Sequence, residues 1–218
     1  MSRTPVLTLG AAVAALAFAG IGAAQAQQYK LPTAKPAGCQ QRGILIEGTS
    51  GNDTRNGHGV SEVMIGFGGN DTLNGRGGAD CLYGNAGRDR LYGGAERDAI
   101  FGGTGKDTAS GGSGNDTISG DADSDRLTGG AGNDSISGGT GNDLVSGDNG
   151  NDRLQGGPGD DTISAGYGKD VVSGSTGDDK IYAVDRTVDT INCGAGADKV
   201  SADEADAVAT NCENVTRK

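Results

Sequence analysis

The amino-acid sequence predicts an all-β protein whose chain winds as a solenoid of two parallel sheets. The first observation is a unit of nine residues that recurs without a gap over residues 48–182, in fifteen copies. The second is that each copy joins a glycine-rich turn to a short polar–apolar–polar segment. The third is the abundance of glycine, with 43 in a chain of 218 residues. A fixed short period is typical of solenoids, in which each repeat packs only on its neighbours.

The copy at 111–119, Gly-Gly-Ser-Gly-Asn-Asp-Thr-Ile-Ser, shows what each position is expected to do. The first position is Gly in fourteen copies, and the sixth is Asp in fourteen. Glycines allow backbone conformations with positive φ, so the first six residues predict a turn. The last three residues alternate polar, apolar and polar, which predicts a three-residue strand with one side chain toward a core.

Two units of nine residues are expected to return the chain to its starting side, so that fifteen units make about seven and a half coils. With strands about 4.8 Å apart, the stack would be about 35 Å tall. The apolar residues at position eight then form two ladders that face each other. One ladder is predicted to hold Leu73, Leu91, Leu127, Val145, Ile163 and Ile181, and the other Leu82, Ile100, Ile118, Ile136, Leu154 and Val172. One medium-sized apolar side chain per nine residues makes a thin core, which should not hold the chain folded by itself.

The sixth position carries a carboxylate in every copy, so the predicted fold stacks a column of negative charge on each of its two edges. One column holds Asp53, Asp71, Asp89, Asp107, Asp125, Asp143, Asp161 and Asp179, and the other Glu62, Asp80, Asp98, Asp116, Asp134, Asp152 and Asp170. Calcium takes six to eight oxygens and would offset the repulsion, with carbonyl groups of the turns as further ligands. The predicted calcium ligands are Asp71, Asp80, Asp89, Asp98, Asp107, Asp116, Asp125, Asp134, Asp143, Asp152, Asp161, Asp170 and Asp179.

The pattern Gly-Gly-x-Gly-x-Asp-x-aliphatic-x resembles the RTX nonapeptide of secreted bacterial calcium-binding proteins with haemolysin-type repeats. The resemblance covers residues 48–182. The best-matching turns are 102–107, 111–116, 129–134, 138–143 and 156–161. It implies a right-handed parallel β-roll with several calcium ions between successive turns, held by the Asp at position six and by turn carbonyls. Copies with Val60, Glu96 or Asp123 at position four, and the copy with Glu62 at position six, depart from the motif.

The first 26 residues are predicted to be an export signal, because an apolar stretch at 6–24 ends in Ala24-Gln25-Ala26, with cleavage after Ala26. An uncleaved membrane anchor is the alternative, since the stretch is nearly long enough to span a bilayer. Residues 27–47 are expected to form a linker and an N-terminal cap. Within this cap, Ile44-Leu45-Ile46 predicts a strand that covers the open end of the first coil.

The net charge of −11 at pH 7 argues against nucleic acid and anionic membranes as partners. The sequence has no second long apolar stretch, so membrane insertion of the exported chain is not expected. Acidic chains with few aromatic residues are often disordered. We therefore expect a secreted, extracellular protein that is disordered in chelator and folds when calcium binds.

After residue 182 the register slips, and residues 183–218 are expected to be degenerate repeats that form a C-terminal cap. Four cysteines in an exported chain indicate two disulfides, for which three pairings are compatible. Pairing near neighbours at each end favours Cys193–Cys212 and Cys39–Cys81. The segment around Cys193 and Cys212 also resembles the tail of secreted actinobacterial members of the RTX family, which often carry a disulfide there.

The protein is expected to be non-enzymatic. Motifs for zinc, serine-nucleophile and phosphate chemistry are absent, and the single His58 is expected to be a turn residue. One alternative is an adhesin, matrix component or carbohydrate-binding module, in which Tyr83, Tyr92 and Phe101 form a patch for an extracellular polysaccharide or protein. These aromatic residues could equally pack on one another across strands. A further alternative is a polysaccharide-modifying enzyme, for which Tyr83, Arg90 and Tyr92 are the only hint.

Overall fold

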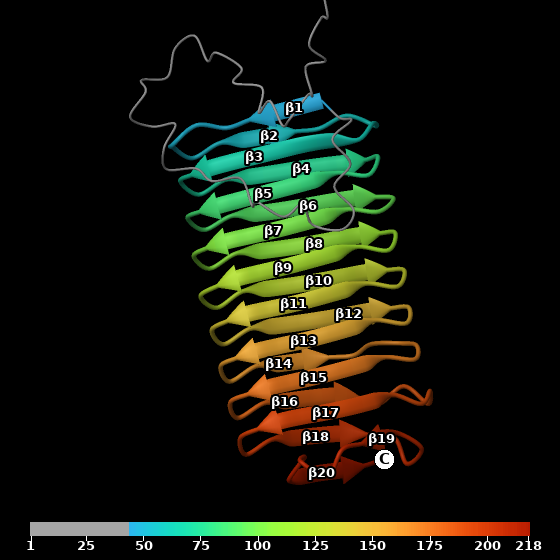
Figure 1. Cartoon of the computed structure of the whole chain (residues 1–218). Coiled ribbons are helices and arrows are strands. Elements are labelled where there is room, and N and C mark those ends of the chain that lie inside the picture. The colour runs from blue at the N-terminus through green and yellow to red at the C-terminus, as the bar shows by residue number, and fades with distance from the viewer. Residues whose placement is uncertain (1–43) are drawn as a thin grey trace, which may run out of the picture. The chain divides into compact units, whose positions relative to one another are not determined.

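A computed structural model describes residues 44–218, which form two parallel ten-stranded β-sheets with no helix in this range (Figure 1). Consecutive strands alternate between the two sheets, so that two strands complete one coil. The strands stack in chain order from β1 to β20 (Figure 1). The predicted all-β solenoid is confirmed.

The odd-numbered strands form sheet A and the even-numbered strands form sheet B. Sheet A contains β1 (Ile44–Glu47), β3 (Glu62–Gly68), β5 (Cys81–Ala86), β7 (Ala99–Thr104), β9 (Thr117–Ala122), β11 (Ser135–Thr140), β13 (Arg153–Pro158), β15 (Val171–Thr176), β17 (Thr190–Ala195) and β19 (Ala207–Val208). Sheet B contains β2 (Thr54–Asn56), β4 (Thr72–Gly77), β6 (Arg90–Ala95), β8 (Thr108–Ser113), β10 (Arg126–Ala131), β12 (Leu144–Asn149), β14 (Thr162–Ser164), β16 (Lys180–Ala183), β18 (Lys199–Ala202) and β20 (Asn214–Arg217).

The core between the sheets is made by the residues at position eight of the repeat. In sheet A, Ile118 lies opposite Ile136, and in sheet B, Leu127 lies opposite Val145. Every member of the two predicted ladders is at most 2 % exposed. The same core also contains Met64, Ala109, Ile191 and Val200. Both ladders are therefore confirmed, and they continue beyond the fifteen regular copies.

Most strands are six residues long, twice the predicted length, because the first half of the expected turn is extended chain. In β9 the glycine at position one, Gly120, follows Ile118 on the inner face and is buried. Positive φ occurs instead at positions two and four, as at Gly112 (φ 108°) and Gly114 (φ 139°). The turn itself is thus confined to positions four to six.

Glycine at position one is required by close approach and not by backbone conformation. A Cβ on Gly111 would overlap the Oδ2 atom of Asp116 and lie 2.7 Å from the carbonyl oxygen of Gly129 in the next coil of that sheet. Ala165 occupies this position in one copy, and there strand β14 stops at Ser164 after only three residues. The coils still stack closely at Ala165, whose N–H donates to the carbonyl oxygen of Tyr182 at 2.8 Å and whose carbonyl oxygen would overlap a Cβ on Gly147.

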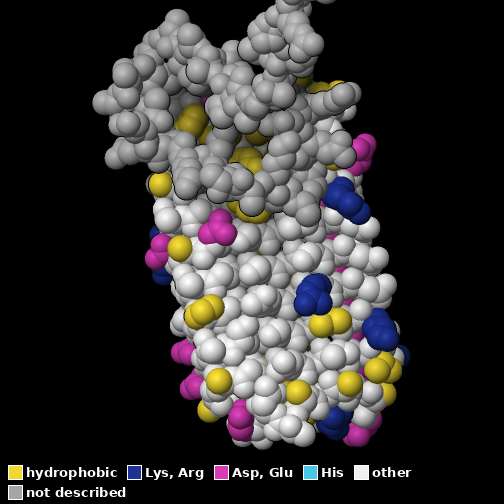
Figure 2. All heavy atoms as spheres, in the orientation of Figure 1, with side chains coloured by type: hydrophobic (Ala, Val, Ile, Leu, Met, Phe, Trp, Pro, Cys, Tyr) yellow, Lys and Arg dark blue, Asp and Glu magenta, His cyan; other side chains and the backbone are white. Residues whose placement is uncertain are grey.

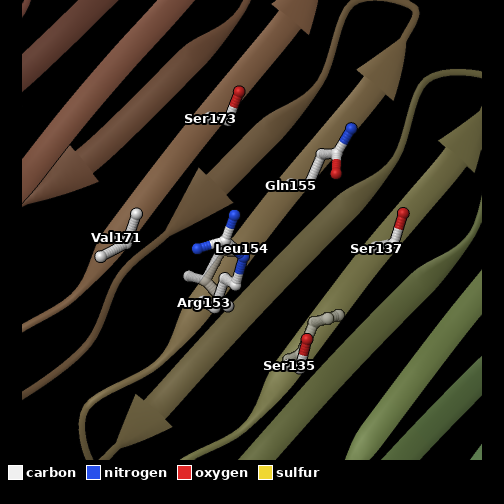
Figure 3. Close-up of a pocket in the computed structure, with 8 residues that line it drawn as sticks. Ser135, Ser137, Arg153, Leu154, Gln155, Val171 and Ser173 are labelled. Carbon is white, nitrogen blue, oxygen red and sulfur yellow. The ribbon is translucent and has the colours of Figure 1, made fainter. Parts of the chain in front are cut away.

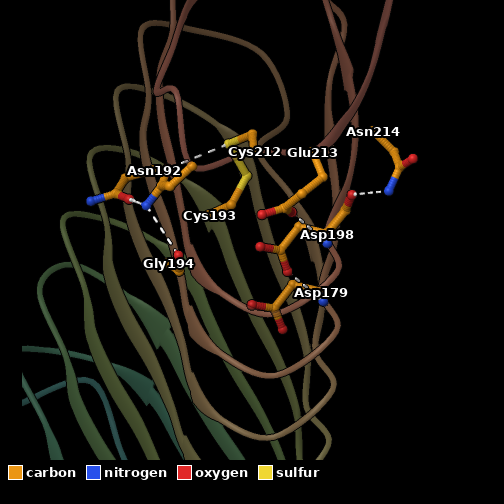
Figure 4. Close-up of a disulfide and its surroundings, with 9 residues drawn as sticks. Asp179, Asn192, Cys193, Gly194, Asp198, Cys212, Glu213 and Asn214 are labelled. Carbon is orange, nitrogen blue, oxygen red and sulfur yellow. Dashed lines mark hydrogen bonds between the residues drawn. A yellow bond between two sulfur atoms is a disulfide. The ribbon is translucent and has the colours of Figure 1, made fainter.

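The sheets continue past residue 182 with one extra residue in the coil, so that Val172 lies opposite Ile191. Cys193 and Cys212 form a disulfide with a Cα–Cα distance of 5.2 Å, which confirms this predicted pairing (Figure 4). Cys81 is also disulfide-bonded and buried. Its predicted partner, Cys39, lies outside the described residues, so that pairing stays a prediction.

At the other end, the predicted strand around Leu45 is present as β1 and pairs with β3. The export signal and the linker that the sequence predicts lie outside the described residues. Within residues 44–218, no helix is long and apolar enough to cross a membrane.

Candidate metal centre

The carboxylates at position six form two hydrogen-bonded columns, one on each edge of the solenoid. The backbone N–H of Asp98 donates to Oδ1 of Asp116, and that of Asp116 donates to Oδ1 of Asp134, each at 2.8 Å. The same bond recurs at 2.7–2.9 Å through both columns as far as Asp189 and Asp198. All thirteen sequence-predicted ligands lie in these columns, on the edges to which the repeat assigned them.

From Glu62 to Asp198, the second oxygen of each carboxylate in these columns has no hydrogen-bond donor. These carboxylate residues are at most 4 % exposed. Within the described chain, the oxygens that are buried without a partner are Oε2 of Glu62 and Oδ2 of Asp71, Asp80, Asp89, Asp98, Asp107, Asp116, Asp125, Asp134, Asp143, Asp152, Asp161, Asp170, Asp179, Asp189 and Asp198. Buried polar atoms normally have partners, so a repeated exception is typical of oxygens that bind a ligand.

The surroundings of these oxygens are rich in further oxygen atoms. Oδ2 of Asp116 and the carbonyl oxygen of Gly129 border the same small space beside the Cα atom of Gly111. Oδ2 of Asp134 and the carbonyl oxygen of Gly147 border the equivalent space beside Gly129. A carboxylate with main-chain carbonyls and no N–H donor is a donor set that a hard cation prefers.

Burial raises the pKa of Asp98 and Asp125 to about 8 and that of Asp107 and Asp161 to about 7, and neighbouring carboxylates add to the effect. The backbone hydrogen bond to each Oδ1 opposes this rise only in part. Burial also raises to about 6 the pKa values of Asp80, Asp89, Asp134, Asp152, Asp170, Asp179 and Asp189. The ionised columns are therefore unfavourable unless a cation is added.

Each coil contributes one carboxylate to each edge, and the described residues contain no group of three or more Asp, Glu, His or Cys side chains that could hold a metal ion. A calcium ion at these edges would therefore take most of its oxygens from the main chain. The position-six residues from Glu62 to Asp161, and Asp179, fit this demand, because each combines a partner-free carboxylate oxygen with a carbonyl from the next coil.

The ends of the columns differ from their interior, because protein groups satisfy the carboxylates there. Asp53 accepts the N–H and the hydroxyl of Thr49 at one oxygen and pairs with Arg55 at the other. Asp206 accepts the N–H groups of Asp189 and Asp203. The partner-free oxygens are thus confined to the stretch between these ends.

Two residues that the ligand prediction left out, Asp189 and Asp198, belong to the columns and have partner-free oxygens. Their Asp-x-aliphatic pattern could have identified them from the sequence. The coil there is one residue longer than the repeat, so they do not fall at position six of the nine-residue period. Glu62, which departs from the motif, keeps its place because Oε1 accepts the His58 N–H and lies 3.1 Å from His58 Nδ1.

A second ladder at position five was not expected from the sequence. The N–H of Asn133 donates to Oδ1 of Asn115, and the N–H of Asn151 donates to Oδ1 of Asn133, each at 2.8 Å. This ladder lies in the exposed turns beside the buried columns. The sequence feature that could have predicted this ladder is the frequent Asn at position five, because its short side chain reaches the backbone of the next turn.

The aromatic residues do not form the single patch that the sequence suggested. Tyr83 and Phe101 stack in sheet A with ring centroids 5.2 Å apart, as packed cross-strand aromatics do. Tyr92 lies in β6 of sheet B. Because neighbouring copies alternate between sheets, Tyr83 also lies in a different sheet from Arg90. The three residues Tyr83, Arg90 and Tyr92, which suggested an enzyme site, therefore do not form one group.

A shallow hollow lies on the outer face of sheet A over β11, β13 and β15 (Figure 3). Its lining includes Ser135, Ser137, Arg153, Gln155 and Ser173, without a carboxylate or histidine. It therefore lacks the acid–base pair that glycosidic cleavage uses.

Comparison with protein families agrees with this geometry. The RTX calcium-binding nonapeptide repeat, described in units of four copies, matches residues 65–100, 92–127, 101–136, 110–145, 119–154 and 146–181. Together these matches cover 65–181, more than half of the chain. No curated protein matches the chain. The repeats, the two-sheet solenoid and the partner-free carboxylates thus agree, and the chain belongs to the RTX calcium-binding nonapeptide-repeat family as a calcium-binding β-roll protein.

Proposed function

We propose that the protein is a secreted, non-enzymatic β-roll that folds when calcium ions bind between successive turns of both edges. The observation that carries this proposal is the set of sixteen buried carboxylate oxygens without a hydrogen-bond donor. The proposed ligands are the thirteen predicted aspartates from Asp71 to Asp179, with Asp189 and Asp198 added. Main-chain carbonyls complete each site.

Calcium binding and folding are coupled in this proposal through charge. Folding buries carboxylates one above another and raises their pKa values, as it does for Asp98. A chain without a cation must either protonate these groups or bury their charge, and both oppose folding at neutral pH. Calcium bound to the folded roll offsets this cost, and the unfolded chain has no preformed site to compete for it.

Export is supported by two features. The predicted signal over residues 1–26 directs the chain out of the cytoplasm. The Cys193–Cys212 disulfide favours an oxidising compartment, since such bonds are rare in the cytosol. Calcium outside the cell would then start folding only after export.

A non-enzymatic role is supported by the outer faces of the sheets. The hollow over β11, β13 and β15 is lined by hydroxyls, Arg153 and Gln155 and has no general acid or base. The only histidine in the chain, His58, is bound to Glu62 at the first coil. The aspartates with raised pKa values are explained by calcium ligation.

Circular dichroism of the chain from residue 27 onward tests the proposal. In excess EDTA the spectrum should be that of a disordered chain, and added calcium should produce a β spectrum and a cooperative melting transition. Magnesium, which requires stricter octahedral geometry and dehydrates reluctantly, should be far less effective. A chain that is compact and cooperative in EDTA, with a melting temperature that calcium leaves unchanged, would refute the proposal.

A further inference from the structure

We propose that the outer face of sheet B binds a linear acidic polysaccharide that lies along the axis of the roll. The feature that carries this inference is a row of four cations at position seven of the repeat, which we call the cation row. It consists of Arg90 in β6, Arg126 in β10, Lys180 in β16 and Lys199 in β18, all of them exposed.

The strand register places the cation row in one straight line. Arg90 and Arg126 both lie opposite Thr108, so that one strand separates them. From Arg126 the line passes through Leu144 and Thr162 to Lys180. With strands about 4.8 Å apart, the intervals are about 10, 14 and 5 Å, all close to multiples of one spacing. A linear polymer whose negative charges recur about every 5 Å can therefore meet all four cations at once.

Lys180 and Lys199 lie directly opposite each other in neighbouring strands. Like charges at such a cross-strand pair are destabilising. No ion pair or side-chain hydrogen bond connects either lysine, or either arginine of the row, to another residue of the described chain. The ion pairs found in residues 44–218 are Arg55–Asp53 and His58–Glu62. An external anion would offset the repulsion that the fold leaves in place.

The same face has few acidic side chains at the outward positions of its strands, and the one beside the hydroxyl residues is Asp148 in β12, which accepts the Ser146 hydroxyl at 2.6 Å. From β4 to β18, positions seven and nine of sheet B contain no Asp or Glu, although the chain has 29 acidic residues. Figure 2 shows one face of the molecule, on which uncharged surface predominates between scattered acidic and basic side chains. Calcium at the edges would neutralise the columns nearest this face, so that the cations act on a ligand with less opposing charge nearby.

The rest of the face suits sugars better than nucleic acid. Tyr92, 38 % exposed, and Tyr182, 48 % exposed, lie two residues after Arg90 and Lys180 on the same outward face. The remaining position-nine residues from β8 to β18 are hydroxyl residues, Ser110, Thr128, Ser146, Ser164 and Ser201. Flat rings and hydroxyls match the faces and edges of sugar rings. Nucleic acid would require a denser basic surface than four cations on a chain with a pI of about 4.4.

Fluorescence anisotropy in saturating calcium tests the inference with end-labelled oligosaccharides of hyaluronan and of chondroitin sulfate. We expect at least one of these to bind, rising salt to weaken it, and neutral dextran not to bind. Replacement of the cation row by serine (R90S/R126S/K180S/K199S) should weaken binding by at least about tenfold, because several rim charges are lost together.

The matched control removes four exposed cations from the turns, at position five (R88S/R97S/K106S/K169S), and should change binding by less than about twofold. A second variant, K180E alone, keeps the other three cations and should also weaken binding. Circular dichroism of each variant in calcium measures folding independently of polysaccharide binding. A failure of calcium-dependent folding can therefore be distinguished from a failure of polysaccharide binding. No binding of either polysaccharide, equal loss in the control variant, or tighter binding of single-stranded DNA would overturn it.

Discussion

At position one of the repeat, the glycine and the carboxylate five residues later form one packing unit. Asp116 turns its Oδ1 to the N–H of Asp98 and its Oδ2 to the space beside Gly111. The glycine is needed because a Cβ would fill this space, and the carboxylate supplies the partner-free oxygen that borders it. Both residues of the repeat are thus explained by one contact.

Replacement of Asp116 by Asn should have opposite effects with and without calcium. The amide keeps the Oδ1 acceptor for Asp98 but removes the charge, and its NH₂ group can donate to a nearby carbonyl. In saturating calcium we expect the free energy of unfolding to fall by about 1–3 kcal/mol, because a charged ligand is lost. In EDTA the variant should be more folded than the wild type.

Urea titrations followed by circular dichroism in both media would measure the effect. Glu204→Gln, at an exposed turn outside both columns, is the matched control and should change neither curve. Equal destabilisation in calcium and in EDTA would contradict a ligand role for Asp116.

Replacement of Gly111 by Ala should destabilise the calcium-loaded roll by about 1–3 kcal/mol through overpacking. The added Cβ would overlap Asp116 Oδ2 and approach the Gly129 carbonyl oxygen. Gly59→Ala is the matched control, because nothing lies within 4 Å of the Cβ position there. Thermal melting in saturating calcium measures both, and a similar melting temperature for the two variants would show that close approach is not the constraint.

At the scale of elements, each turn is held by contacts to the next turn and by few contacts within itself. The position-five side chains, such as Asn115 and Asn133, accept N–H groups from the turn that follows one coil later. Each turn therefore depends on a neighbour, which is typical of solenoids. In the last described coils, the Cys193–Cys212 disulfide joins β17 to the segment before β20 (Figure 4).

Loss of this disulfide should destabilise the C-terminal coils. The bond closes a loop with a sequence separation of 19, for which about 3 kcal/mol of stabilisation is expected. We expect Cys193→Ser/Cys212→Ser to lower the free energy of unfolding by about that amount in saturating calcium, as measured by urea unfolding. Cys212→Ala alone keeps the buried Cys193 side chain and should lose nearly as much. A small loss in the single variant would assign the effect to packing instead of the crosslink.

At the scale of the whole molecule, the negative charge of the carboxylate columns opposes folding along their full length. Burial raises the pKa values of Asp98 and Asp125 to about 8, against an ordinary value of 3.8. The folded, metal-free chain therefore holds protons that the unfolded chain has released. Stability from this source is present below pH 3.8 and is lost as pH rises through the folded values of about 6 to 8.

The metal-free chain should accordingly gain β structure on acidification. In EDTA, circular dichroism should show more β structure at about pH 4 than at about pH 8. In saturating calcium the dependence should reverse, because protons compete with calcium for the same carboxylates. A metal-free chain whose β content is independent of pH would mean that the columns do not control folding.

Much of the molecule follows from the nine-residue period. Ile118 and Leu127 were placed in opposing ladders because position eight alternates between the two sheets, and the structure has them there. The two edges of aspartates follow from the same alternation. Tyr83 and Tyr92 were grouped by sequence proximity, and that grouping was wrong because the alternation that sorts the core also sorts the outer faces.

The sequence by itself determined the period, the fold class, the inward ladders and the aspartate columns. These features depend on which way each side chain points along a short strand, and local alternation sets that direction. Only the tertiary structure decided that Asp116 Oδ2 lacks a donor, that Gly111 is needed for close approach, and that Lys180 lies opposite Lys199. The partners in these contacts come from the next coil, so stacking has to bring them together.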